Sequence, residues 1–113
     1  MYEYKELYTL DFTNVTDYFH MHRIIKKELD FPHYYGENLD ALWDCLTDMT
    51  DDPIHIQIIG FDVLCEKLRE DKMEHKVTPL LETFRDFKHY CNDRYADSIL
   101  IEIVDGDLRT PIE

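Results

Sequence analysis

Residues 33 to 46, HYYGENLDALWDCL, join an aromatic loop to a segment with the apolar spacing of a helix. The helix should begin after Gly36, with Asn38 as its N-cap. Asp40 falls in the first turn, where a negative charge suits the helix dipole, and the helix should end near residues 48 to 50. The stretch carries three acidic residues, no Lys or Arg, and the only Trp of the chain.

The two sides of this predicted helix differ in charge when its residues are placed at about 100° each. The side that should face the core carries Leu39, Leu42, Leu46 and Met49, with Cys45 nearby. The acidic side carries Asp40, Asp44 and Asp48, with Glu37 beside them if it is helical, and Trp43 lies at the edge of the apolar stripe. Each pair of like charges at this spacing lowers the stability of the helix by roughly a few tenths of a kcal/mol. Neither Lys nor Arg occurs between Lys27 and Lys67 to offset them.

Two interpretations of this segment remain open from the residues alone. Carboxylates flanked by Trp43, Tyr34 and Tyr35 are typical of an interface anchor for a cationic cleft. The alternative is a solvated acidic face with a Trp that covers the edge of the core.

The chain before this segment predicts one strand and one helix. Residues 4–12 alternate loosely between apolar and polar residues, as a strand does. Residues 14–30 predict a helix with Thr16 as N-cap and an apolar face that includes Phe19, Ile24 and Ile25.

The chain after it predicts two further strands and two further helices. Residues 53–59 alternate cleanly and predict a strand, and residues 61–70 predict a short helix. A longer helix should start at Thr78-Pro79 or near Glu74. Its core stripe is formed by Leu80, Phe84, Phe87 and Cys91. Residues 98–104 predict a buried strand, and the polar tail 105–113 should be peripheral.

This order of elements predicts an α/β fold. Helical crossovers between strands favour a small, three-stranded parallel sheet packed with about four helices. A chain of 113 residues fits a single domain, 1–113, with its core over about 4–104.

Composition narrows the classes of function and the compartment. The formal net charge of −13 repels phosphates, which disfavours nucleic-acid binding and favours a basic partner. We expect no secretory signal and no membrane span. Three cysteines without C-x-x-C spacing favour reduced thiols in a cytoplasmic protein over disulfides or a zinc site. The six histidines are scattered, with His55 on the polar side of its strand, and we expect them to be hydrogen-bonded or solvated, without a metal or other cofactor.

The segment FPHYYGENLDALWDCLTD (residues 31–48) closely resembles the signature segment of the barstar family of intracellular ribonuclease inhibitors. RIIKKELDFP before it, FRDFK at 84–88 and SILIEIV at 98–104 resemble matching family segments. The resemblance implies a barstar-like fold and one-to-one, reversible inhibition of a basic, extracellular-type microbial ribonuclease such as barnase.

The same resemblance implies roles for individual residues. A carboxylate that takes the place of a substrate phosphate corresponds to Asp44, and a second acidic contact corresponds to Asp40. Tyr34 matches an aromatic residue that packs on the catalytic His of the nuclease, and Trp43 matches an interface Trp. With Tyr35 of the loop and the additional carboxylate Asp48 included, the predicted partner-binding set is Tyr34, Tyr35, Gly36, Asn38, Leu39, Asp40, Trp43, Asp44, Asp48 and Asp86.

Some residues depart from the family pattern. Asp86 stands where the family has a Glu that makes a peripheral contact, and Asp48 replaces a small residue. An insertion falls around residues 66–76. The main rival is therefore a barstar-like adaptor or immunity protein that binds another basic protein or nuclease toxin.

Catalysis is a further alternative, because Asp40 and Asp44 could act as acid and base or bind a divalent metal. They lie on a convex helix face, and the chain has no recognisable nucleophile arrangement or Gly-rich phosphate loop. We therefore expect no enzymatic activity.

Overall fold

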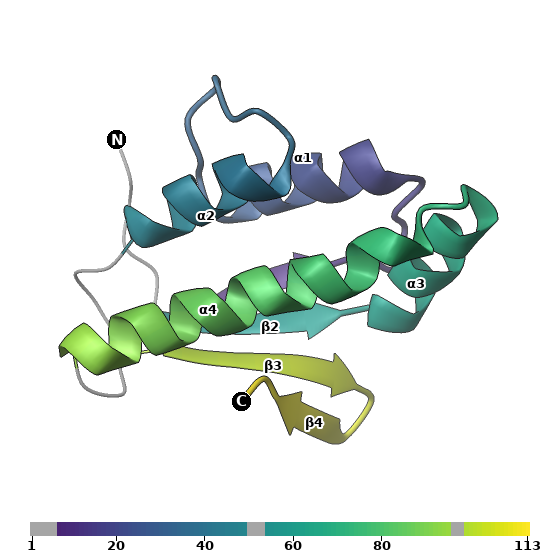
Figure 1. Cartoon of the computed structure of the whole chain (residues 1–113). Coiled ribbons are helices and arrows are strands. Elements are labelled where there is room, and N and C mark those ends of the chain that lie inside the picture. The colour runs from purple at the N-terminus through teal and green to yellow at the C-terminus, as the bar shows by residue number, and fades with distance from the viewer. Residues whose placement is uncertain (1–6, 50–53, 96–98) are drawn as a thin grey trace.

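The computed structural model describes residues 7–49, 54–95 and 99–113, and of residues 92–95 the backbone alone (Figure 1). The first residues of all three predicted strands, 4–6, 53 and 98, lie outside this part. The elements are β1 (Leu7–Asp11), α1 (Tyr18–Glu28), α2 (Leu39–Thr47), β2 (Ile54–Ile59), α3 (Phe61–Glu70), a 3-10 turn η1 (Glu74–Lys76), α4 (Val77–Tyr95), β3 (Ile99–Asp105) and β4 (Leu108–Pro111). Their order confirms the predicted α/β fold.

The sheet has the strand order β1-β2-β3-β4, and its first three strands are parallel. In the centre of the sheet, Ile56 pairs with Tyr8 on one side and with Ile101 on the other. These three side chains are buried and point to the same face of the sheet. Helices α1, α2 and α4 lie over this face, so the hydrophobic core is between the helices and the sheet (Figure 1).

The fourth strand was missed by the sequence interpretation, which treated 105–113 as a peripheral tail. Asp105 pairs with Leu108 across a two-residue turn, in which Gly106 has a φ of +60°, a conformation that suits glycine. The Ile112 N–H donates to Ile101 O at 2.8 Å, and Lys88 Nζ of α4 donates to Ile112 O at 2.8 Å. The tail thus folds back along β3 as an antiparallel hairpin.

On the opposite face of the sheet, Glu102 of β3 is buried but the residue two positions before it is exposed, so only part of β3 is buried as predicted. Leu100 is 41% exposed there. His55 lies on this polar side, as predicted, and its Nε2 is 2.6 Å from Glu102 Oε1. That hydrogen bond holds the pKa of the Glu102 carboxyl below its usual value. Arg109 of β4 lies 3.8 Å from the same carboxylate and helps to hold β4 to the sheet.

Helix α1 begins one residue later than predicted. Its N-cap is Asp17, whose side chain accepts a hydrogen bond from the His20 N–H at 2.8 Å, so the expectation of Thr16 was wrong. The buried stripe starts at Tyr18 and ends at Ile25. Phe19 lies about 100° from that stripe and is 51% exposed, which corrects its predicted place in the core.

Helix α4 begins at Val77, directly after η1, so its helical path starts near Glu74 as one of the two predictions had it. Its predicted core stripe is confirmed, because all four residues are buried: Leu80, Phe84, Phe87 and Cys91. In the described ranges, none of the helices is long and apolar enough to cross a membrane. All three cysteines are free thiols.

Candidate protein-binding surface

Helix α2 begins where the sequence predicts, because Asn38 organises the turn before it. The Asn38 Oδ1 accepts a hydrogen bond from the Ala41 N–H at 2.8 Å, which is the N-cap bond. The Asn38 Nδ2 donates to Gly36 O at 3.1 Å, so the same side chain also holds the preceding loop. A Cβ atom at Gly36 would lie 3.2 Å from that amide nitrogen, a tight contact that favours glycine there.

The acidic side of α2 is solvent-exposed along its whole length. Asp40, Asp44 and Asp48 are all exposed. Within the described part of the chain, none of the three side chains has an ion pair or a hydrogen bond. Asp40 lies in the first turn, where a negative charge stabilises the helix. Asp48 is the C-cap, where a negative charge is unfavourable, and the last turn carries no basic residue to offset it. We call these three side chains the acidic row.

Trp43 and the apolar side of α2 fix this row against the core. Leu42 and Leu46 are fully buried, and Leu39 is partly buried against the same core. Trp43 is half-buried at the edge, as predicted, and its ring meets the Tyr90 ring of α4 edge-on, with centroids 5.6 Å apart. The row is therefore presented by a helix whose opposite side is anchored.

Asp86 lies on α4, one turn before Tyr90, and so on the side of α4 that approaches α2. Its side chain is 63% exposed, and its carboxylate lies 3.9 Å from Arg85 Nε, a long surface ion pair of little energy. The position fits the peripheral role implied by the resemblance.

The two tyrosines of the loop face opposite ways. Tyr34 is 76% exposed, and its ring packs edge-on beside His33, with centroids 5.8 Å apart. Tyr35 is buried, so the structure does not place its side chain on the surface, contrary to our inclusion of it in the partner-binding set. Its ring packs against Phe31, and its hydroxyl lies 2.6 Å from His22 Nδ1 of α1. Tyr35 therefore holds the loop from within.

Two cations of α1 hold the loop at its ends. Lys26 Nζ donates to His33 O at 3.2 Å, and Arg23 lies 3.6 Å from the Glu37 carboxylate. Glu37 has a φ of +52° and is outside the helix, so it does not extend the acidic row. Figure 1 shows this loop as an arch between α1 and α2 on the side away from the sheet.

His22 is a buried residue behind this loop whose role sequence reasoning missed. The His22 ring is fully buried and meets the Tyr18 ring edge-on. Its Nε2 has no hydrogen-bond partner among the described residues. Burial, helped by the nearby charge of Lys76, lowers the pKa of His22 to about 4. Our expectation of a hydrogen-bonded or solvated ring holds for Nδ1 only. The signal available in the sequence was its place, four positions after Tyr18 and three before Ile25, on the buried stripe of α1.

The acidic row and its surroundings offer a charged surface to a partner. Over the described ranges, no group of three His, Cys, Asp or Glu side chains could hold a metal ion. The surface offers three exposed carboxylates that form no ion pair with the described residues, on a helix whose other side is buried and whose preceding loop exposes the Tyr34 ring. Such a surface fits a cationic protein cleft.

Fold and surface thus define an acidic α/β protein that presents three exposed carboxylates on one helix. The sequence profile of the family described as Barstar (barnase inhibitor) matches residues 6–102, and the chain belongs to this family. A protein of Bacillus subtilis (strain 168), named "Putative ribonuclease inhibitor YrdF", is 48% identical to this chain over 52 residues. The aligned part covers 46% of this chain and 54% of that protein, so the chain spans about half the length of the curated relative.

Proposed function

We propose that this protein inhibits a microbial ribonuclease of the barnase type by plugging its cationic active site. The acidic row of α2 would enter the cleft, with Asp44 in the place of a substrate phosphate. A nuclease active site is cationic because it stabilises phosphate charge, and a carboxylate offers the same charge without a bond to cleave. The proposal takes the protein as a single, cytoplasmic domain that is not itself an enzyme and binds its target one to one.

The observation that carries this proposal is that the acidic row has no ion pair or side-chain hydrogen bond with any described residue. Carboxylates of a merely solvated face normally alternate with Lys or Arg, which relieves repulsion. Here three carboxylates at helical spacing form no ion pair with the described residues, their helix also carries Trp43, and the loop before it exposes Tyr34. Membership of the barstar family and the name of the relative point to the same class of target.

Titration of the protein into a barnase assay tests the proposal, with Asp44→Ala in parallel and Glu66→Gln, an exposed site on α3, as a charge-matched control. Truncating one member of a desolvated charge pair costs about 2–5 kcal/mol, so Asp44→Ala should weaken inhibition at least thirty-fold, roughly. The control should inhibit like the wild type.

Circular dichroism and urea unfolding must show that each variant is folded. Unchanged inhibition by folded Asp44→Ala would contradict phosphate mimicry. If the folded wild type did not inhibit barnase at all, a different basic protein or nuclease toxin would be the target, as expected of a barstar-like adaptor or immunity protein.

A further inference from the structure

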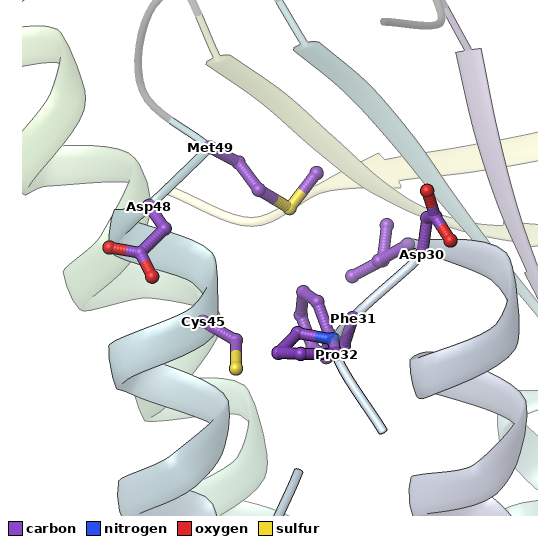
Figure 2. A pocket seen from close by; sticks show the side chains of 7 residues that line it. Asp30, Phe31, Pro32, Cys45, Asp48 and Met49 are labelled. Atoms are coloured by element: carbon purple, nitrogen blue, oxygen red, sulfur yellow. The ribbon is translucent and has the colours of Figure 1, made fainter. Parts of the chain in front are cut away.

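A small pocket opens beside the acidic row, between the end of α1, the loop that follows it and the last turn of α2 (Figure 2). Its volume is ≈ 270 Å³, below the roughly 300–1,000 Å³ of small-molecule sites. Its lining is mostly apolar: Leu29, Phe31, Pro32, Cys45 and Met49. The size and lining suit one long side chain of a partner better than a separate ligand.

Two carboxylates complete the lining from opposite sides of the pocket. Asp30 follows α1, and Asp48 caps α2 (Figure 2). Both are exposed, neither forms an ion pair in the described part of the chain, and no Lys or Arg lines the pocket. Burial and the charges of Asp48 and Asp44 raise the pKa of the Cys45 thiol, which therefore remains neutral. The pocket combines an apolar interior with an uncompensated negative mouth.

We propose that this pocket receives one Arg side chain of the bound ribonuclease. The aliphatic stem would pack on Pro32 and Met49, and the guanidinium would lie at the mouth, where Asp30 and Asp48 supply negative charge from either side. Arg suits the site because its stem is apolar, while its guanidinium always carries a positive charge and offers five donors to a carboxylate. The inference rests on the proposed function and adds a specificity contact to it.

The position of the pocket supports this occupant. Asp48 belongs both to the pocket and to the acidic row, one turn beyond Asp44. Pro32 on the opposite wall precedes the exposed Tyr34 by two residues. A protein that contacts Tyr34 and Asp44 together would therefore cover the mouth of the pocket.

The turn at Asp30 allows a clean variant. Asp30 has a φ of +54°, and the Phe31 N–H donates to Lys26 O at 2.9 Å, as in the helix ends that usually carry glycine at this place. Asp30→Gly should keep this turn while removing the carboxylate. Asp48→Asn removes the other charge at nearly constant shape, and Glu66→Gln serves again as the remote control.

The first test is an NMR titration of the isotope-labelled protein with acetyl-arginine amide and with its neutral analogue acetyl-citrulline amide. The cation should shift the backbone amides of Phe31, Cys45 and Met49 and bind about five-fold more tightly than citrulline. Asp48→Asn and Asp30→Gly should lose this preference, and Glu66→Gln should retain it. Equal binding of both probes to the wild type would overturn the proposal.

The second test measures barnase inhibition by the same variants and separates the two proposals. Asp48→Asn and Asp30→Gly should each weaken inhibition three- to ten-fold, roughly, which is less than the effect of Asp44→Ala. Inhibition unchanged by both variants would overturn the Arg pocket and leave the proposed function standing. A wild-type protein that binds the arginine probe but does not inhibit barnase would support the Arg pocket and contradict the proposal that a barnase-type ribonuclease is the target.

Discussion

Lowering the pH from 8 to 5 should reduce the free energy of unfolding by about 2 kcal/mol through His22 alone. In the folded protein the His22 ring is fully buried and its pKa is lowered to about 4. In the unfolded chain the ordinary pKa of 6.5 applies. Between these values the unfolded state binds more protons, so stability falls as the pH falls from about 6.5 to about 4.

The magnitude follows from the two pKa values. A difference of about 2.5 units at 1.36 kcal/mol per unit gives a full effect of about 3 kcal/mol, of which about 2 kcal/mol is lost by pH 5. The structural cause is the surroundings of the ring. Protonation would add a second N–H to a ring whose Nε2 has no described acceptor, with Tyr18 and Tyr35 packed against it and Lys76 nearby.

Urea unfolding from pH 8 to 5, followed by the fluorescence of Trp43, measures this effect. Trp43 is a suitable probe because its half-buried ring contacts α4. His22→Asn keeps a polar atom near the Nδ1 position but cannot titrate, and His89→Asn, at an exposed site, is the matched control.

The His22→Asn profile should be flatter than that of the wild type by about 2 kcal/mol at pH 5, whatever its stability at pH 8. The His89→Asn profile should keep the wild-type slope. Carboxylates with lowered pKa values, such as Glu102, lose their contribution only below pH 4.5 and are common to all three proteins. Parallel profiles for wild type and His22→Asn would refute a neutral, buried His22.

Three further effects should be measurable. Asp48→Asn should raise the free energy of unfolding by about 0.3–1 kcal/mol in urea, because it removes a negative charge from the C-terminal end of α2. Asn38→Ala should lower it by about 1 kcal/mol through loss of the N-cap bond, and Asn38→Asp should restore most of the loss. In stopped-flow experiments, the association rate with barnase should fall steeply with salt, because opposite charges steer the encounter; a salt-independent rate would contradict that steering.

Elements whose signals are local could be predicted closely. The N-cap of α2, its end within one to three residues, and the stripe from Leu80 to Cys91 all follow from neighbours three or four positions apart. At α1, Thr16 and Asp17 are both good caps, and sequence preference alone did not decide between them. Phe19 was assigned to the core face because it is apolar, but it lies about 100° from the buried stripe and is exposed.

Features that depend on distant contacts were not predictable in the same way. The burial of Tyr35 depends on His22, thirteen positions earlier, which fills the space behind the loop. The exposure of Leu100 on β3 depends on which sides of the sheet the helices cover. For β4 a local signal existed, since Gly106-Asp107 is a recognised two-residue hairpin pair, but the polar composition of the strand concealed it.

The distribution of charge along the helices argues that the acidic row serves a partner. Helices α1 and α3 end with basic residues, Lys26 and Lys27 in one and Lys67 and Arg69 in the other, as the helix dipole favours. Helix α2 has none and is capped by Asp48 instead. The same chain thus follows the rule at two helix ends and breaks it at the helix that presents unpaired carboxylates. The like charges of α2 lower the stability of this one helix, and a bound cationic partner would offset that loss.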